Sequence, residues 1–241
     1  MRPFSTCKCS KAALRRLALL AMVPLGLAAP GAIAGTVWLS EIATGVGNVP
    51  VRSMQALRFA RTVHQQFDYS CGSAAVATLL SYQYGDPISE QAVFSAMWQN
   101  GDQTKIRREG FSLLDMKRYL DAHGFQANGY DAPLSKLAEV GVPAIVLVSE
   151  HGYNHFVVVK GLSGGRALVG DPSMGARTLP IERFRKTMRS PILFVVTNHR
   201  QEAVFNGRAD WSNQPLAPLG QALDISNLAL TRVLTPGAIQ F

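Results

Sequence analysis

The chain has few cysteines and, near its N-terminus, an apolar run too short for a transmembrane helix. Its 241 residues include three cysteines, and Cys7 and Cys9 stand among the first nine positions. The apolar run LALLAMVPLGLAA has thirteen residues and contains Pro24, whereas a transmembrane helix needs roughly 20 residues. Cys71, the cysteine outside this N-terminal stretch, and the scattered histidines lack the ligand spacing of a zinc site. We therefore expect neither a metal nor another cofactor.

The first 34 residues have the pattern of a secretory signal peptide. The head, MRPFSTCKCSKAALRR, carries five basic residues and no acidic residue. After the apolar run, Ala32 and Ala34 stand in the A-x-A arrangement of a cleavage site. We expect residues 1–34 to be cleaved after Ala34 and the protein to be exported to the periplasm. The alternative is an uncleaved anchor; after cleavage no stable membrane span is expected.

Cleavage would change the charge and the cysteine count. Five basic residues would leave with the head, so the formal net charge would fall from +8 to +3. Few dense basic runs remain, and the run ERFRKTMR is typical of the solvated face of a helix, so nucleic acid is not expected as a partner. Cys71 would be the one remaining thiol, and an unpaired cysteine in an oxidising compartment needs an explanation.

The rest of the sequence predicts a lead-in segment (35–59), one domain (60–198) and a partly ordered C-terminal extension (199–241). In the domain, three helical patterns come first, starting at Cys71, Ser89 and Ser112. The stretch NGDQTKIRREG between the last two is expected to be a loop. Strands are predicted for short runs rich in Val, Ile and Leu, at 144–149, 155–162, 166–171 and 192–197. This order predicts an α+β fold with N-terminal helices packed on a C-terminal antiparallel sheet.

Cys71 is either a buried core residue or a nucleophile at the positive end of its helix. A thiol reacts as thiolate, which the helix N-terminus and a nearby imidazolium favour. His155 is the preferred base because it enters a strand, whereas His151 stands before it. A regular hairpin with its turn at 163–165 would place Asp171 nearly opposite His155, where it could orient the imidazole.

An acyl transfer by Cys71 also needs donors for the oxyanion. The backbone N–H of Cys71 can supply one of them. A side-chain amide just upstream would be the second, and both Gln65 and Gln66 are placed to supply it. The chemistry of the residues alone does not choose between them.

These motifs, in this order, resemble the papain-like bacteriocin-processing cysteine peptidases, found in ABC exporters that cut leader peptides after a double glycine. The resemblance covers roughly residues 60–198 and rests on Gln65, on Cys71-Gly72, on His155-Phe156 and on Gly170-Asp171-Pro172. The six-residue step from Gln65 to Cys71 and the sixteen-residue step from His155 to Asp171 agree with the family pattern. The resemblance implies the papain-like fold and assigns the oxyanion role to Gln65.

A signal peptide without an ATP-binding domain makes the chain similar to the stand-alone exported form, as in functional-amyloid secretion systems. The resemblance then implies a protein or peptide substrate, among amyloid subunits or their secretion machinery. We expect a cysteine endopeptidase that uses Cys71, His155, Asp171 and Gln65. A non-catalytic client-binding or chaperone module on the same fold is one alternative, and amide hydrolysis of a small molecule is another.

Overall fold

The computed structural model describes residues 36–38, 48–50, 52–150 and 152–213. The expected signal peptide, part of the lead-in segment (35, 39–47 and 51) and residues 214–241 of the expected extension lie outside the described residues. The helices and strands follow the chain in this order: β1 (Thr36–Trp38), β2 (Asn48–Pro50), α1 (Met54–Arg58), α2 (Cys71–Gln83), α3 (Glu90–Asn100), α4 (Gln103–Glu109), α5 (Leu113–Ala122), β3 (Ala127–Asp131), α6 (Ser135–Val140), β4 (Ala144–Glu150), β5 (Tyr153–Ser163), β6 (Arg166–Asp171), β7 (Gly175–Pro180), α7 (Ile181–Thr187), β8 (Ile192–Val196) and α8 (Arg208–Ser212).

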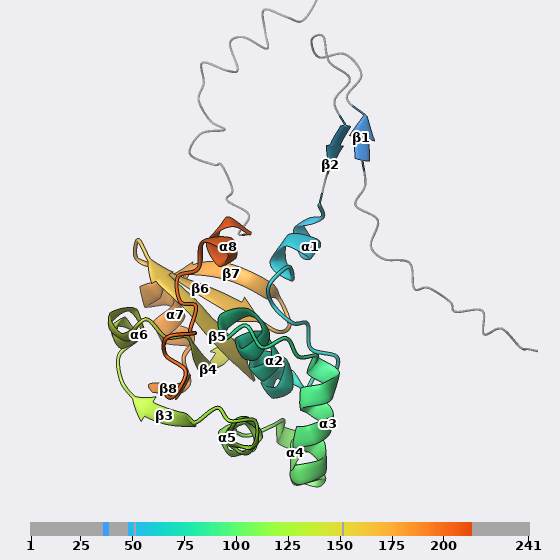
Figure 1. Ribbon diagram of the computed structural model, residues 1–241, viewed down its shortest axis with the longest axis vertical. Coiled ribbons are helices and arrows are strands. Elements are labelled where there is room, and N and C mark those ends of the chain that lie inside the picture. Colours follow the sequence, from blue (N-terminus) through green and yellow to red (C-terminus); the bar gives the residue numbers. More distant parts are fainter. Residues whose placement is uncertain (1–35, 39–47, 51, 151, 214–241) are drawn as a thin grey trace, which may run out of the picture.

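Six strands form one antiparallel sheet in the order β3-β8-β4-β5-β6-β7. Helices α2 to α5 precede it in the chain, so the predicted α+β class with N-terminal helices and an antiparallel sheet is confirmed. Figure 1 shows α3, α4 and α5 gathered at one end of the molecule and α8 near the opposite end. In the part of the chain that the structure describes, no helix is both long and apolar enough to cross a membrane.

The prediction that the stretch NGDQTKIRREG forms a loop is wrong, because helix α4 occupies most of it. The Asp102 side chain caps this helix by accepting hydrogen bonds from the backbone N–H groups of Thr104 and Lys105. Ile106 anchors the helix in the core, where 1% of its surface is exposed. One buried residue in a polar stretch is too weak a periodic signal to be recognised in the sequence.

Helices cover both faces of the sheet because apolar side chains of its central strands alternate between the faces. On one face, Phe156 and Val158 of β5 pack with α2, α3 and α5 in a single apolar cluster. On the other face, Val157 and Val159 pack with Phe184 of α7 and with residues of α6. A strand covered on both faces is apolar throughout, which explains the uninterrupted run FVVV.

The β5–β6 hairpin has a different register from the predicted one. Its two-residue loop, Gly164-Gly165, has φ values of +54° and +71°, as a tight hairpin turn of the primed type requires. The ladder shifts between Val159 and Gly161, where Lys160 is an extra residue on β5. Because Val158 then pairs with Gly170, the same register places Asp171 beside Val157. A bulge of this kind has no clear signature in hydrophobic periodicity.

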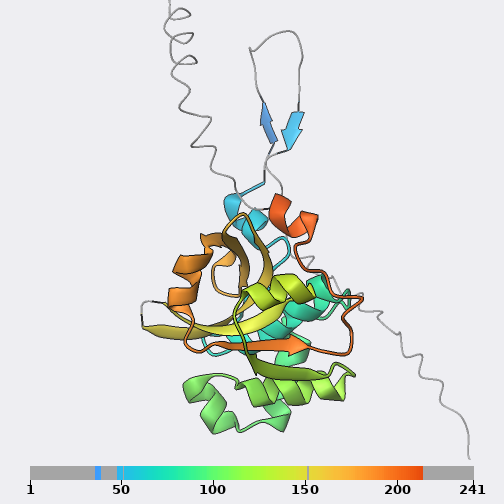
Figure 2. The ribbon, with the colours of Figure 1, turned by 90° about the vertical axis from the view of Figure 1, so that its left-hand side faces the viewer.

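The segment after β8 runs back over the domain to α8. Val204 donates its backbone N–H to the Gln83 carbonyl, and Asn206 donates to the Lys160 carbonyl. Figures 1 and 2 show α1 and α8 side by side at one end of the molecule. These two helices, far apart in the sequence, therefore lie together at that end of the molecule.

Candidate active site

Cys71 is the first residue of α2 and lines an open cleft of about 570 Å³. Its exposed fraction is 5%, so little of the residue's surface reaches the cleft. Gly72 permits this placement, because a Cβ at that position would lie 2.9 Å from Cβ of Phe111. The other cleft residues come from the loop before α2, from α4 with Gly110, and from Tyr153 and Asn154.

The surroundings of Cys71 act on its pKa in both directions. Burial raises the pKa of the thiol, and the negative charge of Asp171 raises it further. The backbone N–H groups of Phe156, Gly72 and Cys71 itself oppose this rise by stabilising a thiolate. The net pKa is raised, because desolvation is the largest effect and outweighs the backbone N–H groups at the helix end. A reactive thiolate here needs a cationic partner.

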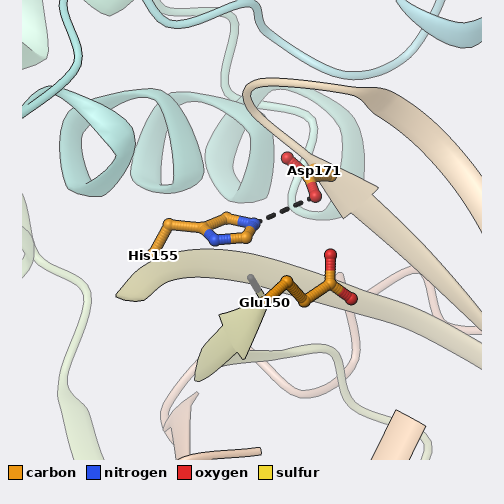
Figure 3. Close-up of side chains that lie close together, drawn as sticks. All are labelled: Glu150, His155 and Asp171. Carbon is orange, nitrogen blue, oxygen red and sulfur yellow. Dashed lines mark hydrogen bonds and ion pairs between the residues drawn. The ribbon is translucent and has the colours of Figure 1, made fainter. Parts of the chain in front are cut away.

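His155 and Asp171 are in direct contact, as predicted. His155 Nε2 lies 3.0 Å from Asp171 Oδ2, and both side chains are buried. They are diagonal neighbours on adjacent strands and share one face of the sheet, since His155 is two residues from Val157. Figure 3 shows the imidazole directed at the carboxylate.

Asp171 is held on both carboxylate oxygens. Oδ1 accepts hydrogen bonds from the backbone N–H groups of Ser173 and Met174 and from the Ser173 hydroxyl, at 2.8–3.1 Å. Burial by itself would raise the pKa of Asp171, but the hydrogen bonds from His155 and Ser173 and the charge of His155 outweigh it and lower the pKa to about 2. Asp171 is therefore an ionised hydrogen-bond acceptor at neutral pH.

The second ring nitrogen of His155, Nδ1, is the atom of the site that could accept a proton. An ionised Asp171 can only accept, so Nε2 must carry a hydrogen, and in a neutral imidazole Nδ1 is then the basic nitrogen. Nδ1 is buried and has no hydrogen-bond partner among the described residues. No hydrogen bond joins it to Cys71 within those residues, although the N–H of Phe156, the next residue, acts on the Cys71 thiol.

Gln65 lies in the loop before α2, beside the other candidates. Its backbone N–H donates to the Pro172 carbonyl at 3.0 Å, which ties this loop to the corner after Asp171. Its side-chain Nε2 donates to the Phe67 carbonyl at 3.1 Å. An amide nitrogen has two hydrogens, and the Gln65 side chain also hydrogen-bonds to the Tyr153 hydroxyl, which opposes the rise in the pKa of Tyr153 that burial causes. Gln66, the alternative from the sequence, has an exposed side chain.

Tyr153 was not among the predicted site residues. Its ring stacks on the His155 imidazole with 5.6 Å between centroids, and its hydroxyl donates to the Asp68 carbonyl. The ring therefore covers one face of the imidazole at the edge of the cleft. The sequence signal was available, because Tyr153 stands two residues before His155 and a strand places such residues on one face.

Arg177 and Glu150 were also not predicted from the sequence. Arg177 Nη2 lies 3.1 Å from Asp171 Oδ2 and 2.6 Å from Glu150 Oε2. Ligand atoms of Glu150, His155 and Asp171 lie within 4.8 Å of one another, a spacing that could hold a metal ion. The guanidinium already supplies a cation between the two carboxylates, so a metal would have to displace Arg177.

Comparison with known proteins gives a consistent match over the domain. The model of the Peptidase C39 family matches residues 60–200. The protein named probable functional amyloid protease FapD of Pseudomonas aeruginosa is 41% identical over 146 residues, which cover 61% of this chain and 65% of that relative. The protein of the same name from Pseudomonas fluorescens is 39% identical over 158 residues, 63% of this chain and 70% of that relative.

Solved structures include a similar domain. A double glycine motif protease from an AMS/PCAT transporter, in complex with the leader peptide, is 26% identical to this chain. The match covers 56% of this chain and 91% of that one, with a TM-score of 0.46.

Proposed function

Since the chain belongs to the peptidase C39 family, the resemblance drawn from its sequence is confirmed, and we propose that it is an exported cysteine endopeptidase. In this proposal Cys71 is the nucleophile, His155 the general base and acid, and Asp171 the residue that orients His155. Gln65 Nε2 and the Cys71 backbone N–H hold the oxyanion. No cofactor takes part in this mechanism.

The observation that carries the proposal is that the two ring nitrogens of His155 have different surroundings. Nε2 of His155 is engaged by Asp171, 3.0 Å away, whereas Nδ1 is buried without a partner in the described chain. A buried basic nitrogen without a partner carries a free-energy cost. Taking the proton of the Cys71 thiol would turn that nitrogen into a hydrogen-bond donor beside a thiolate.

The reaction proceeds in two stages. The Cys71 thiol proton moves to His155 Nδ1, and Sγ attacks the peptide carbonyl to form a tetrahedral oxyanion. When the C–N bond breaks, the imidazolium returns the proton to the leaving amine. Water, deprotonated by His155, then hydrolyses the thioester and releases the thiol. The raised pKa of Cys71 means that the thiolate depends on the charge of His155.

The proposed substrate is a secreted client protein whose processing supports the secretion or assembly of functional amyloid in the periplasm. Amyloid subunits or their secretion machinery are the proposed partners. The names of the two Pseudomonas relatives support this assignment. The open cleft of about 570 Å³ beside Cys71 suits an extended peptide better than an enclosed small molecule.

The test compares the N-termini of secreted proteins from cells that carry the wild-type chain or Cys71→Ala. We expect at least one client with a new, uncut N-terminus in the variant. Equal processing and secretion in both strains would refute the peptidase. Reduced secretion without any uncut N-terminus would instead favour the non-catalytic client-binding module.

A further inference from the structure

A line of charged groups from three strands adjoins His155. Asp171 Oδ2, on β6, accepts hydrogen bonds from both His155 Nε2 and Arg177 Nη2, at 3.0 and 3.1 Å. The same nitrogen of Arg177, on β7, donates to Glu150 Oε2 on β4 at 2.6 Å. Figure 3 shows the carboxylates of Glu150 and Asp171 on the same side of the imidazole. Arg177 thus bridges the two carboxylates.

The strand register builds this bridge. Arg177 pairs with Val169, two residues before Asp171, so the two charged side chains share one face of the sheet. The side chain of Asp171 is fully buried, and those of Arg177 and Glu150 are 21% and 15% exposed. Charges this deep are screened far less by solvent than surface pairs.

Arg177 is not needed to place Asp171. The Ser173 and Met174 N–H groups and the Ser173 hydroxyl already fix the other oxygen of the carboxylate. Its effect on the site must therefore be mainly electrostatic. A positive charge that shares Oδ2 with His155 disfavours a second positive charge on the imidazole.

Glu150 offsets that effect. With neutral His155, the charges of Glu150, Arg177 and Asp171 sum to one negative charge, and protonation of His155 makes the cluster neutral. Without Glu150, protonation would instead leave a net positive charge in a buried cluster. A single nitrogen of the Arg177 guanidinium, Nη2, donates to both Glu150 and Asp171. Among the described residues, the buried Nε of Arg177 has no hydrogen-bond partner.

We propose that Arg177 and Glu150 act through Asp171, setting the charge balance around His155 and with it the pH at which Cys71 becomes a reactive thiolate. The inference rests on the proposed peptidase function. The titratable and charged groups that face His155 come from four strands: Glu150, Tyr153, Asp171 and Arg177. The Cys71 thiol at the start of α2 lies close enough to Asp171 to be affected by its charge.

Iodoacetamide tests this without a known client, because it alkylates thiolate. The rate of alkylation at Cys71, followed by the mass of its peptide in the full chain, is measured against pH. The midpoint of this pH dependence is a property of the Cys71–His155 pair and not of either residue alone. Glu150→Gln removes a negative charge and should move it to lower pH, by about one pH unit at most. Arg177→Gln removes a positive charge and should move it to higher pH.

Three further variants make the test specific. The double variant Glu150→Gln/Arg177→Gln should have a midpoint near that of the wild type. Arg177→Lys should also leave it unchanged, since an ammonium can donate to both carboxylates. Glu182→Gln, on the exposed surface of α7, removes a solvent-screened charge and should have no effect. If Arg177→Gln does not fold, Glu150→Gln and Arg177→Lys still decide the outcome.

Midpoints that move in the same direction for both single variants, or not at all, would overturn the inference. This outcome differs from failure of the peptidase proposal. If Cys71→Ala cells still process every client normally, the proposed function fails, whatever the alkylation midpoints do. If Cys71→Ala blocks processing but the midpoints are unchanged, only the role of Arg177 and Glu150 fails.

Discussion

Lys160 Nζ lies 2.9 Å from Asp210 Oδ1, and this ion pair joins β5 to α8 inside the protein. The Lys160 side chain is fully buried, and 2% of the Asp210 side chain is exposed. Burial lowers the pKa of Lys160, and the neighbouring Asp210 carboxylate opposes that change. Arg61 Nε also donates to Asp210, at 3.1 Å. The segment after β8 thus supplies the counterion of a buried lysine on the strand that carries His155.

Asp210→Ala is expected to lower the free energy of unfolding by about 3–5 kcal/mol, because it leaves Lys160 buried without its carboxylate partner. Urea unfolding at neutral pH measures the change. Glu182→Ala is the control, since its ion pair with Arg185 is exposed and its loss should cost about 0.5 kcal/mol or less. Similar small losses in both variants would contradict the structural importance of the Lys160–Asp210 pair.

Asp171 should make the free energy of unfolding of the protein decrease as the pH falls into the acid range. Its pKa falls from 3.8 to about 2 in the folded protein, so folding favours the ionised form. That contribution is complete above about pH 4 and is lost as the pH falls toward about 2; the shift corresponds to about 2 kcal/mol. Urea unfolding of wild type and Asp171→Asn should show this loss between pH 5 and pH 2 in the wild type alone.

The test compares the free energies of unfolding of wild type and variant at each pH. The stability gap between wild type and Asp171→Asn should narrow by about 2 kcal/mol as the pH falls. Glu139→Gln, which changes an exposed carboxylate on α6, should leave the gap to wild type nearly constant. A gap for Asp171→Asn that stays constant or widens in acid would show that Asp171 is not stabilised as an anion in the folded protein.

Gln65→Ala should slow the cleavage of the client by about a hundredfold, the usual effect of removing one oxyanion donor. Gln66→Ala is the matched control, because its exposed side chain has no proposed contact with the reacting carbonyl. Processing time courses in cells measure both rates. A slow Gln66→Ala with a normal Gln65→Ala would reverse the assignment, and equal rates in both variants would remove the side-chain donor from the mechanism.

Much of the fold follows from local patterns. The helix that begins at Cys71 and the strands containing 144–149, 155–162, 166–171 and 192–197 all form, because apolar periodicity and glycine-rich turns are local signals. Ser112 caps α5 with a reciprocal bond to Asp115, as the sequence order around it suggests. The loop prediction failed at α4, where apolar residues are sparse, and the sequence indicated no strand at β3 or β7, which lie at the two edges of the sheet.

The sequence alone determined which residues were candidates for the site. Cys71 begins a helix, His155 enters an apolar strand and Asp171 ends the next one, and these are properties of short stretches. The order and spacing of these residues along the chain were also enough to indicate the peptidase family.

Tertiary structure alone decided how the candidates meet. The bulge at Lys160 changed the register of the hairpin, so that His155 reaches Asp171 diagonally across the strands. Arg177 and Glu150 are 27 positions apart in the chain and meet beside Asp171, and Asp210 reaches Lys160 from 50 positions away. Such contacts depend on the pairing and twist of the whole sheet, which local periodicity does not encode.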